Sequence, residues 1–117
     1  MTLGGSVLRA TGKARTAKRQ SAEVEFKNPV KLLNVVLKGQ YLIVHDDELM
    51  ARGEACTFVY SLNEGKQLVV SFHCTPVARA EARSFLVRTS RVSPESMDEV
   101  REFQFPGSSE AHQVPLR

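Results

Sequence analysis

The chain has 117 residues, of which 42% are hydrophobic, and its formal net charge is +3. This length fits one domain with enough apolar side chains for a core, and no apolar run approaches the roughly 18 to 20 residues of a membrane span. Residues 1–20 carry five basic groups and no acidic group, whereas the remaining 97 residues carry 11 basic and 13 acidic groups. Residues 21–117 therefore have a net charge of −2. Because phosphate contacts need clustered Lys and Arg, this charge argues against a nucleic-acid-binding face on this part of the chain.

Residues 1–20 are predicted to form a disordered basic arm, and residues 21–117 a single β domain. Two interpretations of the arm stay open, a solvated tail or a segment that binds nucleic acid or an anionic membrane surface. Its positive charges are Arg9, Lys13, Arg15, Lys18 and Arg19. These charges follow the apolar residues of the opening segment rather than precede them, which is not the pattern of a signal peptide. We therefore expect a cytoplasmic protein, or a periplasmic or secreted one if a leader is missing from this chain.

From residue 21 onward, short apolar alternations separated by turn residues predict β-strands. In "AEVEF", Val24 and Phe26 share one face, and the glutamates share the other. Asn28 and Pro29 are predicted to end this strand, and Gly39 to form the next turn. Further strands are predicted in 30–37, 41–45, 55–62, 67–77, 84–92 and 100–105, with a last edge strand in 112–116. This spacing predicts an all-β fold, a small antiparallel sandwich or squashed barrel of six to eight strands with one short helix.

The alternation also predicts which side chains form the core. The predicted core residues are Val24, Phe26, Leu37, Ile43, Phe58, Tyr60, Val70, Phe72, Phe85, Val87, Phe103 and Phe105. Within this set, the clearest local unit is a hairpin over residues 55–74.

Two registers of this hairpin keep its apolar faces together. A loop over residues 63–65 pairs Cys56 with Phe72, and a loop over residues 63–67 pairs Cys56 with Cys74. In both registers the two cysteines lie on one face and close together. They would form a disulfide in an oxidising compartment, and would stay reduced as small buried apolar groups in the cytosol.

The segment "HDDELMARG" predicts a short helix over residues 46–52. Asp46 or Asp47 can cap its first turn, and Gly53 can end it. In that first turn the helix dipole favours the negative charges of Asp47 and Glu48. In a second interpretation, the same acidic residues are metal ligands together with the three histidines of the chain. The ligand set would be His45, His73 and His112 with Asp46, Asp47 or Glu48, and zinc or copper would suit it. The sequence requires no cofactor, because this long-range spacing forms no local motif.

The chain carries no Gly-x-Ser-x-Gly elbow and no glycine-rich phosphate loop. We therefore predict a non-enzymatic binding or structural module that acts through protein contacts or a small cavity. Arg79 and Arg83 lie four residues apart, so in a helix they would share a face and could clamp an anion. The alternative is a solvated connection.

The strings "FKNPVKLLNVVLKGQYLIVHDDE", "RGEACTFVY", "VVSFHCTPVAR" and "EFQFPGSSEAHQVP" resemble those of a group of small bacterial β-rich proteins with no assigned activity. The resemblance spans about residues 24–115. Many members follow a signal peptide, so the resemblance implies a β domain outside the cytoplasm and favours a disulfide between Cys56 and Cys74. It implies no catalytic residue.

Overall fold

The computed structural model describes residues 19–115, which form eight strands and one short helix. In chain order these are β1 (Arg19–Leu32), β2 (Val35–Asp46), α1 (Asp47–Ala51), β3 (Thr57–Ser61), β4 (Gln67–Phe72), β5 (Thr75–Ala78), β6 (Leu86–Ser90), β7 (Asp98–Gln104) and β8 (Glu110–Gln113). The predicted all-β fold with one short helix is confirmed. Among these residues no helix is long and apolar enough to cross a membrane.

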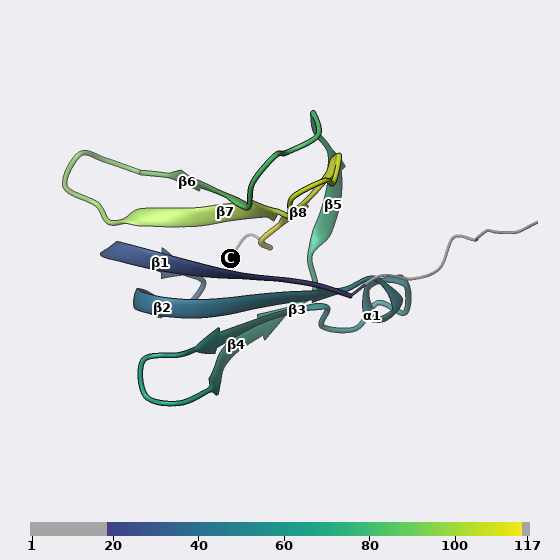
Figure 1. Ribbon diagram of the computed structural model, residues 1–117. Helices are drawn as coiled ribbons and strands as arrows, with labels where there is room; N and C mark the ends of the chain where they lie inside the picture. Colours follow the sequence, from purple (N-terminus) through teal and green to yellow (C-terminus); the bar gives the residue numbers. More distant parts are fainter. Residues whose placement is uncertain (1–18, 116–117) are drawn as a thin grey trace, which may run out of the picture.

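All eight strands belong to one curled sheet with the order β4-β3-β2-β1-β7-β8-β5, and β6 pairs with β7 (Figure 1). The sequence predicted an antiparallel sheet. The pair β1–β7 is parallel, so the sheet is mixed. Strands β1–β4 form one group and β5–β8 a second group that faces it. The predicted last edge strand is β8, but it is an inner strand because it pairs with both β5 and β7.

The link between β4 and β5 explains why the sheet curls. These two strands lie at opposite ends of the strand order, yet only His73 and Cys74 separate them in the chain. A chain of this length spans at most about 11 Å between Phe72 and Thr75. The two ends of the sheet must therefore come close together at this link, which lies beside α1, and the sheet curls into a half-barrel around the core.

The first hairpin turns at Leu33 and Asn34, not at Gly39 as predicted. Leu33 takes a positive φ of 53°, and Gly39 lies inside β2 opposite Phe26 with φ 101°. The register shifts between Phe26 and Val30, so the Asn28–Pro29 segment passes through β1 as an irregularity and does not end it. A proline lacks the N–H that a regular ladder needs, and a bulge accommodates it.

Gly39 also permits a close approach by the β3–β4 loop. Asn63 Oδ1 accepts a hydrogen bond from the backbone N–H of Gln40 at 2.9 Å, and Asn63 Nδ2 donates to the carbonyl of Lys38 at 3.1 Å. A Cβ atom on Gly39 would lie 2.3 Å from Asn63 Oδ1. Glycine is therefore required at this position by both its φ angle and its contact.

Next to its turn, the β3–β4 hairpin follows the predicted register with a loop over residues 63–65, since Tyr60 pairs with Leu68 and Ser61 pairs with Gln67. The register then shifts by one residue between Tyr60 and Val59, so that Thr57, and not Cys56, pairs with Phe72. This bulge explains why Val59 is fully buried while Phe58 and Tyr60, both predicted core residues, are only half-buried. A one-residue shift in register exchanges the two faces of a strand.

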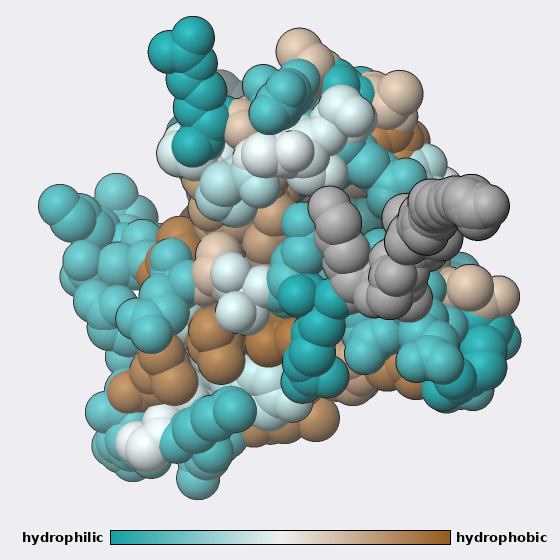
Figure 2. Space-filling view, turned by 45° about the vertical axis from the view of Figure 1, so that its right-hand side comes forward, coloured by the Kyte–Doolittle hydropathy of each residue, from teal (hydrophilic) through white to brown (hydrophobic). Residues whose placement is uncertain are grey.

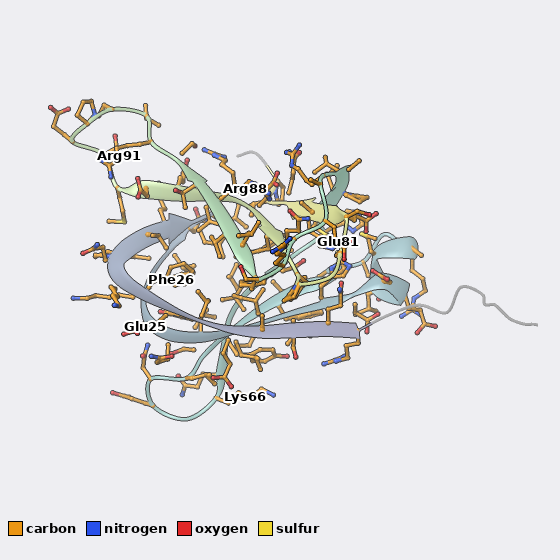
Figure 3. The ribbon with its side chains drawn as sticks, turned by 45° about the horizontal axis from the view of Figure 1, so that its top comes forward. Glu25, Phe26, Lys66, Glu81, Arg88 and Arg91 are labelled. Atoms are coloured by element: carbon orange, nitrogen blue, oxygen red, sulfur yellow. The ribbon has the colours of Figure 1, made fainter. Side chains whose placement is uncertain are left out.

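The core lies inside the curl of the sheet. Figure 3 shows Phe26 directed into this curl and Glu25 directed away from it, as the alternation in β1 predicts. The buried core comprises Phe26, Val30, Leu32, Leu37, Tyr41, Ile43, Cys56, Val59, Phe72, Cys74, Val100, Phe103, Phe105 and Val114. On the outer surface in Figure 2, apolar residues are interleaved with hydrophilic ones. The large exposed apolar side chains are spread over several elements and are Val36, Leu68, Val69, Val92 and Met97.

Candidate metal centre

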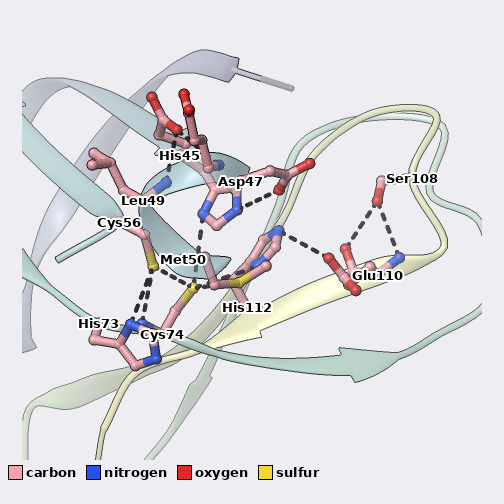
Figure 4. Close-up of polar contacts among 12 residues, drawn as sticks. His45, Asp47, Leu49, Met50, Cys56, His73, Cys74, Ser108, Glu110 and His112 are labelled. Atoms are coloured by element: carbon pink, nitrogen blue, oxygen red, sulfur yellow. Dashed lines mark hydrogen bonds and ion pairs between the residues drawn. The ribbon is translucent and has the colours of Figure 1, made fainter. Parts of the chain in front are cut away.

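Four side chains from distant parts of the sequence converge where the sheet closes beside α1 (Figure 4). His45 lies near the end of β2, Cys56 directly precedes β3, Cys74 lies in the link from β4 to β5, and His112 lies in β8. The exposed fractions of these residues are 0% for the first three and 2% for His112. The cluster therefore lies in an environment that excludes water.

The Cys74 sulfur is the centre of this cluster. Its Sγ lies 3.1 Å from Cys56 Sγ, 3.5 Å from His112 Nδ1 and 3.7 Å from His45 Nδ1. Met50 reaches in from α1 and places its Sδ 3.7 Å from Cys74 Sγ. The ligand atoms of His45, Cys56 and Cys74 all lie within 4.8 Å of one another, an arrangement able to hold a metal ion.

Helix α1 positions one carboxylate against this cluster. Asp46 caps the helix as predicted, since its Oδ1 accepts hydrogen bonds from the N–H groups of Glu48 and Leu49 at 2.9 and 3.1 Å. The chain direction fixed by this cap brings Asp47 back over the end of β2. Asp47 Oδ1 then lies 2.8 Å from His45 Nε2.

This contact sets the tautomer of His45. An ionised carboxylate only accepts hydrogen bonds, so in the neutral form of the ring the hydrogen lies on His45 Nε2 and Nδ1 presents a lone pair toward Cys74. Metal-bound histidines usually have such a carboxylate or carbonyl on the second nitrogen, which orients the ring and raises its basicity. His45 and Asp47 thus have the arrangement of a metal ligand with its supporting carboxylate.

His112 is held as a neutral imidazole. Burial and the neighbouring His45 ring lower the pKa of His112 to about 4. Its ring stacks on that of His45 with centroids 3.7 Å apart, and its Nε2 lies 4.0 Å from Glu110 Oε1. At neutral pH one ring nitrogen of His112 therefore carries a lone pair.

Both sulfur atoms belong to free, buried cysteines. Burial raises the pKa of Cys74 to about 12, and the contact with Cys56 adds to this effect, whereas the nearby Thr57 hydroxyl lowers the pKa. Thr57 is 1% exposed, and its Oγ1 has no hydrogen-bond partner among the described residues. A buried hydroxyl without a partner is costly, and a Cys74 thiolate would accept its hydrogen.

The remaining predicted ligands are directed elsewhere. His73 is exposed. Its Nδ1 lies 2.9 Å from the carbonyl oxygen of Glu54 and 4.0 Å from Cys56 Sγ. Asp46 is engaged in the helix cap. Glu48 points to solvent with 70% of its side chain exposed and pairs with Arg52 at 3.5 Å. The structure thus brings together two of the three histidines and places one acid, Asp47, behind His45.

The cysteines lie close together, as both predicted registers required, and they are free thiols. Sequence reasoning treated the cysteines and histidines as separate questions and did not combine them into one ligand set. It singled out neither Met50 nor Thr57. The order His, Met, Cys, Cys within residues 45–74 was the available signal.

The predicted anion clamp does not have a helical geometry, because residues 79–85 are not helical. Arg79 instead forms two hydrogen bonds with the buried carboxylate of Glu102, at 2.8 and 2.9 Å, and Arg88 forms a third at 2.7 Å. The hydrogen bonds from Arg79 are the main cause of the lowered pKa of Glu102. Arg83 is exposed. Arg79 is therefore occupied within the fold.

The basic arm lies almost wholly outside the described residues, and this includes Arg9, Lys13, Arg15 and Lys18. Arg19 begins β1 and lies 3.5 Å from Asp46 Oδ2. The predicted binding of nucleic acid or an anionic surface through this arm stays a prediction.

No protein-family model, curated protein or solved structure matches this chain. The resemblance to a group of bacterial β-rich proteins therefore stays a prediction. What is known of other proteins assigns no activity here, and the function has to be inferred from the side chains.

Proposed function

We propose that this protein is a non-enzymatic β module that binds a transition-metal ion through His45, Cys56 and Cys74. The observation that supports this most strongly is that these three ligand atoms lie within 4.8 Å of one another in a buried site. Thiolate and imidazole are the ligands that zinc and copper prefer in proteins. The Asp47 carboxylate behind His45 supplies the support that such a ligand needs.

Of two distances between ligand atoms, one agrees with that of a tetrahedral coordination sphere and one is shorter. With metal–sulfur bonds of about 2.3 Å and metal–nitrogen bonds of about 2.05 Å, neighbouring sulfur and nitrogen atoms in a tetrahedral site lie about 3.6 Å apart. Cys74 Sγ and His45 Nδ1 are 3.7 Å apart. Two sulfurs in such a site lie about 3.8 Å apart, so the Cys56–Cys74 distance of 3.1 Å has to widen by about 0.7 Å on metal binding.

A metal ion at this position would join both groups of strands. Cys56 and His45 belong to the first group and Cys74 lies in the link to the second. Because the folded protein would bind the ion and the unfolded chain has no preformed site, metal binding would stabilise the fold. A structural or metal-carrying role follows more directly from this burial than catalysis does, since a buried ion has no open path for a substrate.

The test is a metal titration of tag-free, reduced protein with zinc and with cobalt as a spectroscopic probe. Wild-type protein is expected to bind one ion per chain, and bound cobalt should show sulfur-to-metal charge-transfer absorption. Cys74→Ser and His45→Ala should lose this binding. His73→Ala is the matched control, because His73 is exposed and directed to Glu54, and it should bind like wild type.

Circular dichroism shows whether each variant is folded. If the variants unfold, the cobalt spectrum of the wild-type protein decides the matter alone. A folded wild-type protein that takes up neither ion, or that binds cobalt without sulfur ligation, would overturn the proposal.

A further inference from the structure

The geometry points to monovalent copper as the ion that this site is built to hold, with Met50 as the donor that selects it over zinc. This inference rests on the proposed metal-binding function and concerns the choice of ion and of the remaining ligand. Two side chains compete for that ligand position, since both Met50 Sδ and His112 Nδ1 approach Cys74 Sγ, at 3.7 and 3.5 Å.

The ring stack argues against His112 as that ligand. Two imidazoles on one tetrahedral ion radiate from it, which places their ring centroids about 5 Å apart. The rings of His45 and His112 are stacked with centroids 3.7 Å apart and an angle of 24° between their planes. As they lie, only one of the two rings can direct its lone pair at a shared ion, and His45 is the one that Asp47 orients.

Met50 has no such conflict. It comes from α1, on a different element from both histidines, and its sulfur lies beside Cys74 in Figure 4. Three sulfur atoms thus lie close together, since Cys74 Sγ is 3.1 Å from Cys56 Sγ and 3.7 Å from Met50 Sδ. The donor set then contains two thiolates, one thioether and one imidazole.

This composition distinguishes between the metals. Thioether sulfur is a soft, uncharged donor that binds monovalent copper well, whereas zinc sites in proteins use thiolate, imidazole and carboxylate. Removing a thioether should therefore weaken copper binding and leave zinc binding almost unchanged.

Met50 is also the least buried of the donor residues. It is half-buried, whereas His45, Cys56 and Cys74 are fully buried. A half-buried side chain on a short helix can adjust its position around an ion more readily than the three buried ligands can.

The test is a comparison of the affinities of Cu⁺ and Zn²⁺ for wild-type protein and for Met50→Leu. Copper is supplied anaerobically as Cu⁺ with ascorbate and bicinchoninate as competing ligand. Two Cu²⁺ ions would otherwise oxidise the two thiols to a disulfide, forming two Cu⁺ ions and releasing two protons. Leucine keeps the volume and apolar character of methionine, so the helix should pack as before. Leu49→Ala, on the same helix, controls for disturbance of α1.

We expect Met50→Leu to lower the Cu⁺ affinity at least about tenfold and to change the Zn²⁺ affinity by less than about threefold, because only copper uses the thioether. Leu49→Ala should change the ratio of the Cu⁺ affinity to the Zn²⁺ affinity by less than about threefold. X-ray absorption of the copper-loaded wild type should show mainly sulfur neighbours. A Met50→Leu protein with unchanged Cu⁺ affinity, or with equal losses for both ions, would overturn the inference. Wild-type protein that binds zinc but not Cu⁺ would overturn it and leave the proposed function in place, whereas binding of neither ion would overturn both.

Discussion

Replacement of Asp47 by alanine is expected to weaken metal binding without unfolding the domain. Asp47 Oδ1 lies 2.8 Å from His45 Nε2 and keeps Nδ1 directed at Cys74. Loss of such a supporting group typically lowers metal affinity by about 10- to 100-fold, or about 1.4 to 2.7 kcal/mol. Because Asp47 also begins α1, its loss removes about 0.3 to 1 kcal/mol of favourable interaction with the helix dipole, a small share of the stability of a domain.

The dissociation constants are measured by competition with a chelator of known affinity. Asp47→Asn keeps an oxygen acceptor in the same place and should recover most of the lost affinity, which a general disturbance of the helix would not explain. Glu48→Ala is the matched control, because this neighbouring carboxylate is 70% exposed and pairs with Arg52. If folded Asp47→Ala binds metal as tightly as wild type, then Asp47 does not orient a metal-binding His45, and the reasoning from the hydrogen bond is refuted.

Three further predictions concern the fold and the thiols. Gly39→Ala should lower the free energy of unfolding by at least about 2 kcal/mol, since φ is 101° and the new Cβ would meet the loop asparagine at 2.3 Å. Gly53→Ala, with φ 76° and nothing within 4 Å of the new Cβ, should cost about 1 kcal/mol, and urea unfolding compares the two. Glu102→Gln should destabilise the protein at neutral pH. The pKa of Glu102 is lowered by its arginine partners, so its contribution is present above the ordinary pKa of a glutamate and is lost as the pH falls through the lowered value. Wild type and variant should therefore converge in stability as the pH falls through this lowered pKa, and a gap that persists in more acidic solution would contradict this account. Mild oxidation of metal-free protein should join Cys56 to Cys74 within one chain, because their sulfurs are 3.1 Å apart, whereas peptide mapping that finds mainly cross-linked dimers would argue against this proximity.

The strands were predictable because they depend on local alternation of apolar and polar residues. The pairings beyond a bulge were not, because a bulge adds one residue without leaving a mark in the alternation. The shift between Val59 and Tyr60 reversed the expected faces of β3 in this way. Residues 67–77 read as one continuous strand, and only the structure shows that the chain leaves one end of the sheet after Phe72 and joins the other end at Thr75.

The candidate metal centre depends on this same link, which is why sequence alone could not assemble it. The sequence placed His45 at the end of a strand and Asp46 at a helix cap. Both predictions were possible because they depend only on residues nearby in the sequence. The meeting of Cys74 with His112, 38 positions apart, depends on how β5 pairs with β8. No local pattern encodes that pairing, so the sequence supplied the ligand types and the topology selected among them.

The two-residue link between β4 and β5 also bears on how the chain folds. Strand pairs within β1–β4 and within β5–β8 join residues that are closer in sequence than the pair between the groups. Among residues 19–115, the two groups pair only where Val30 and Lys31 meet Asp98 and Glu99. Contacts between distant residues form slowly, so we expect the docking of the two groups to be the late step of folding. An ion held around Cys74 would act after that step, and would therefore slow unfolding more than it accelerates folding.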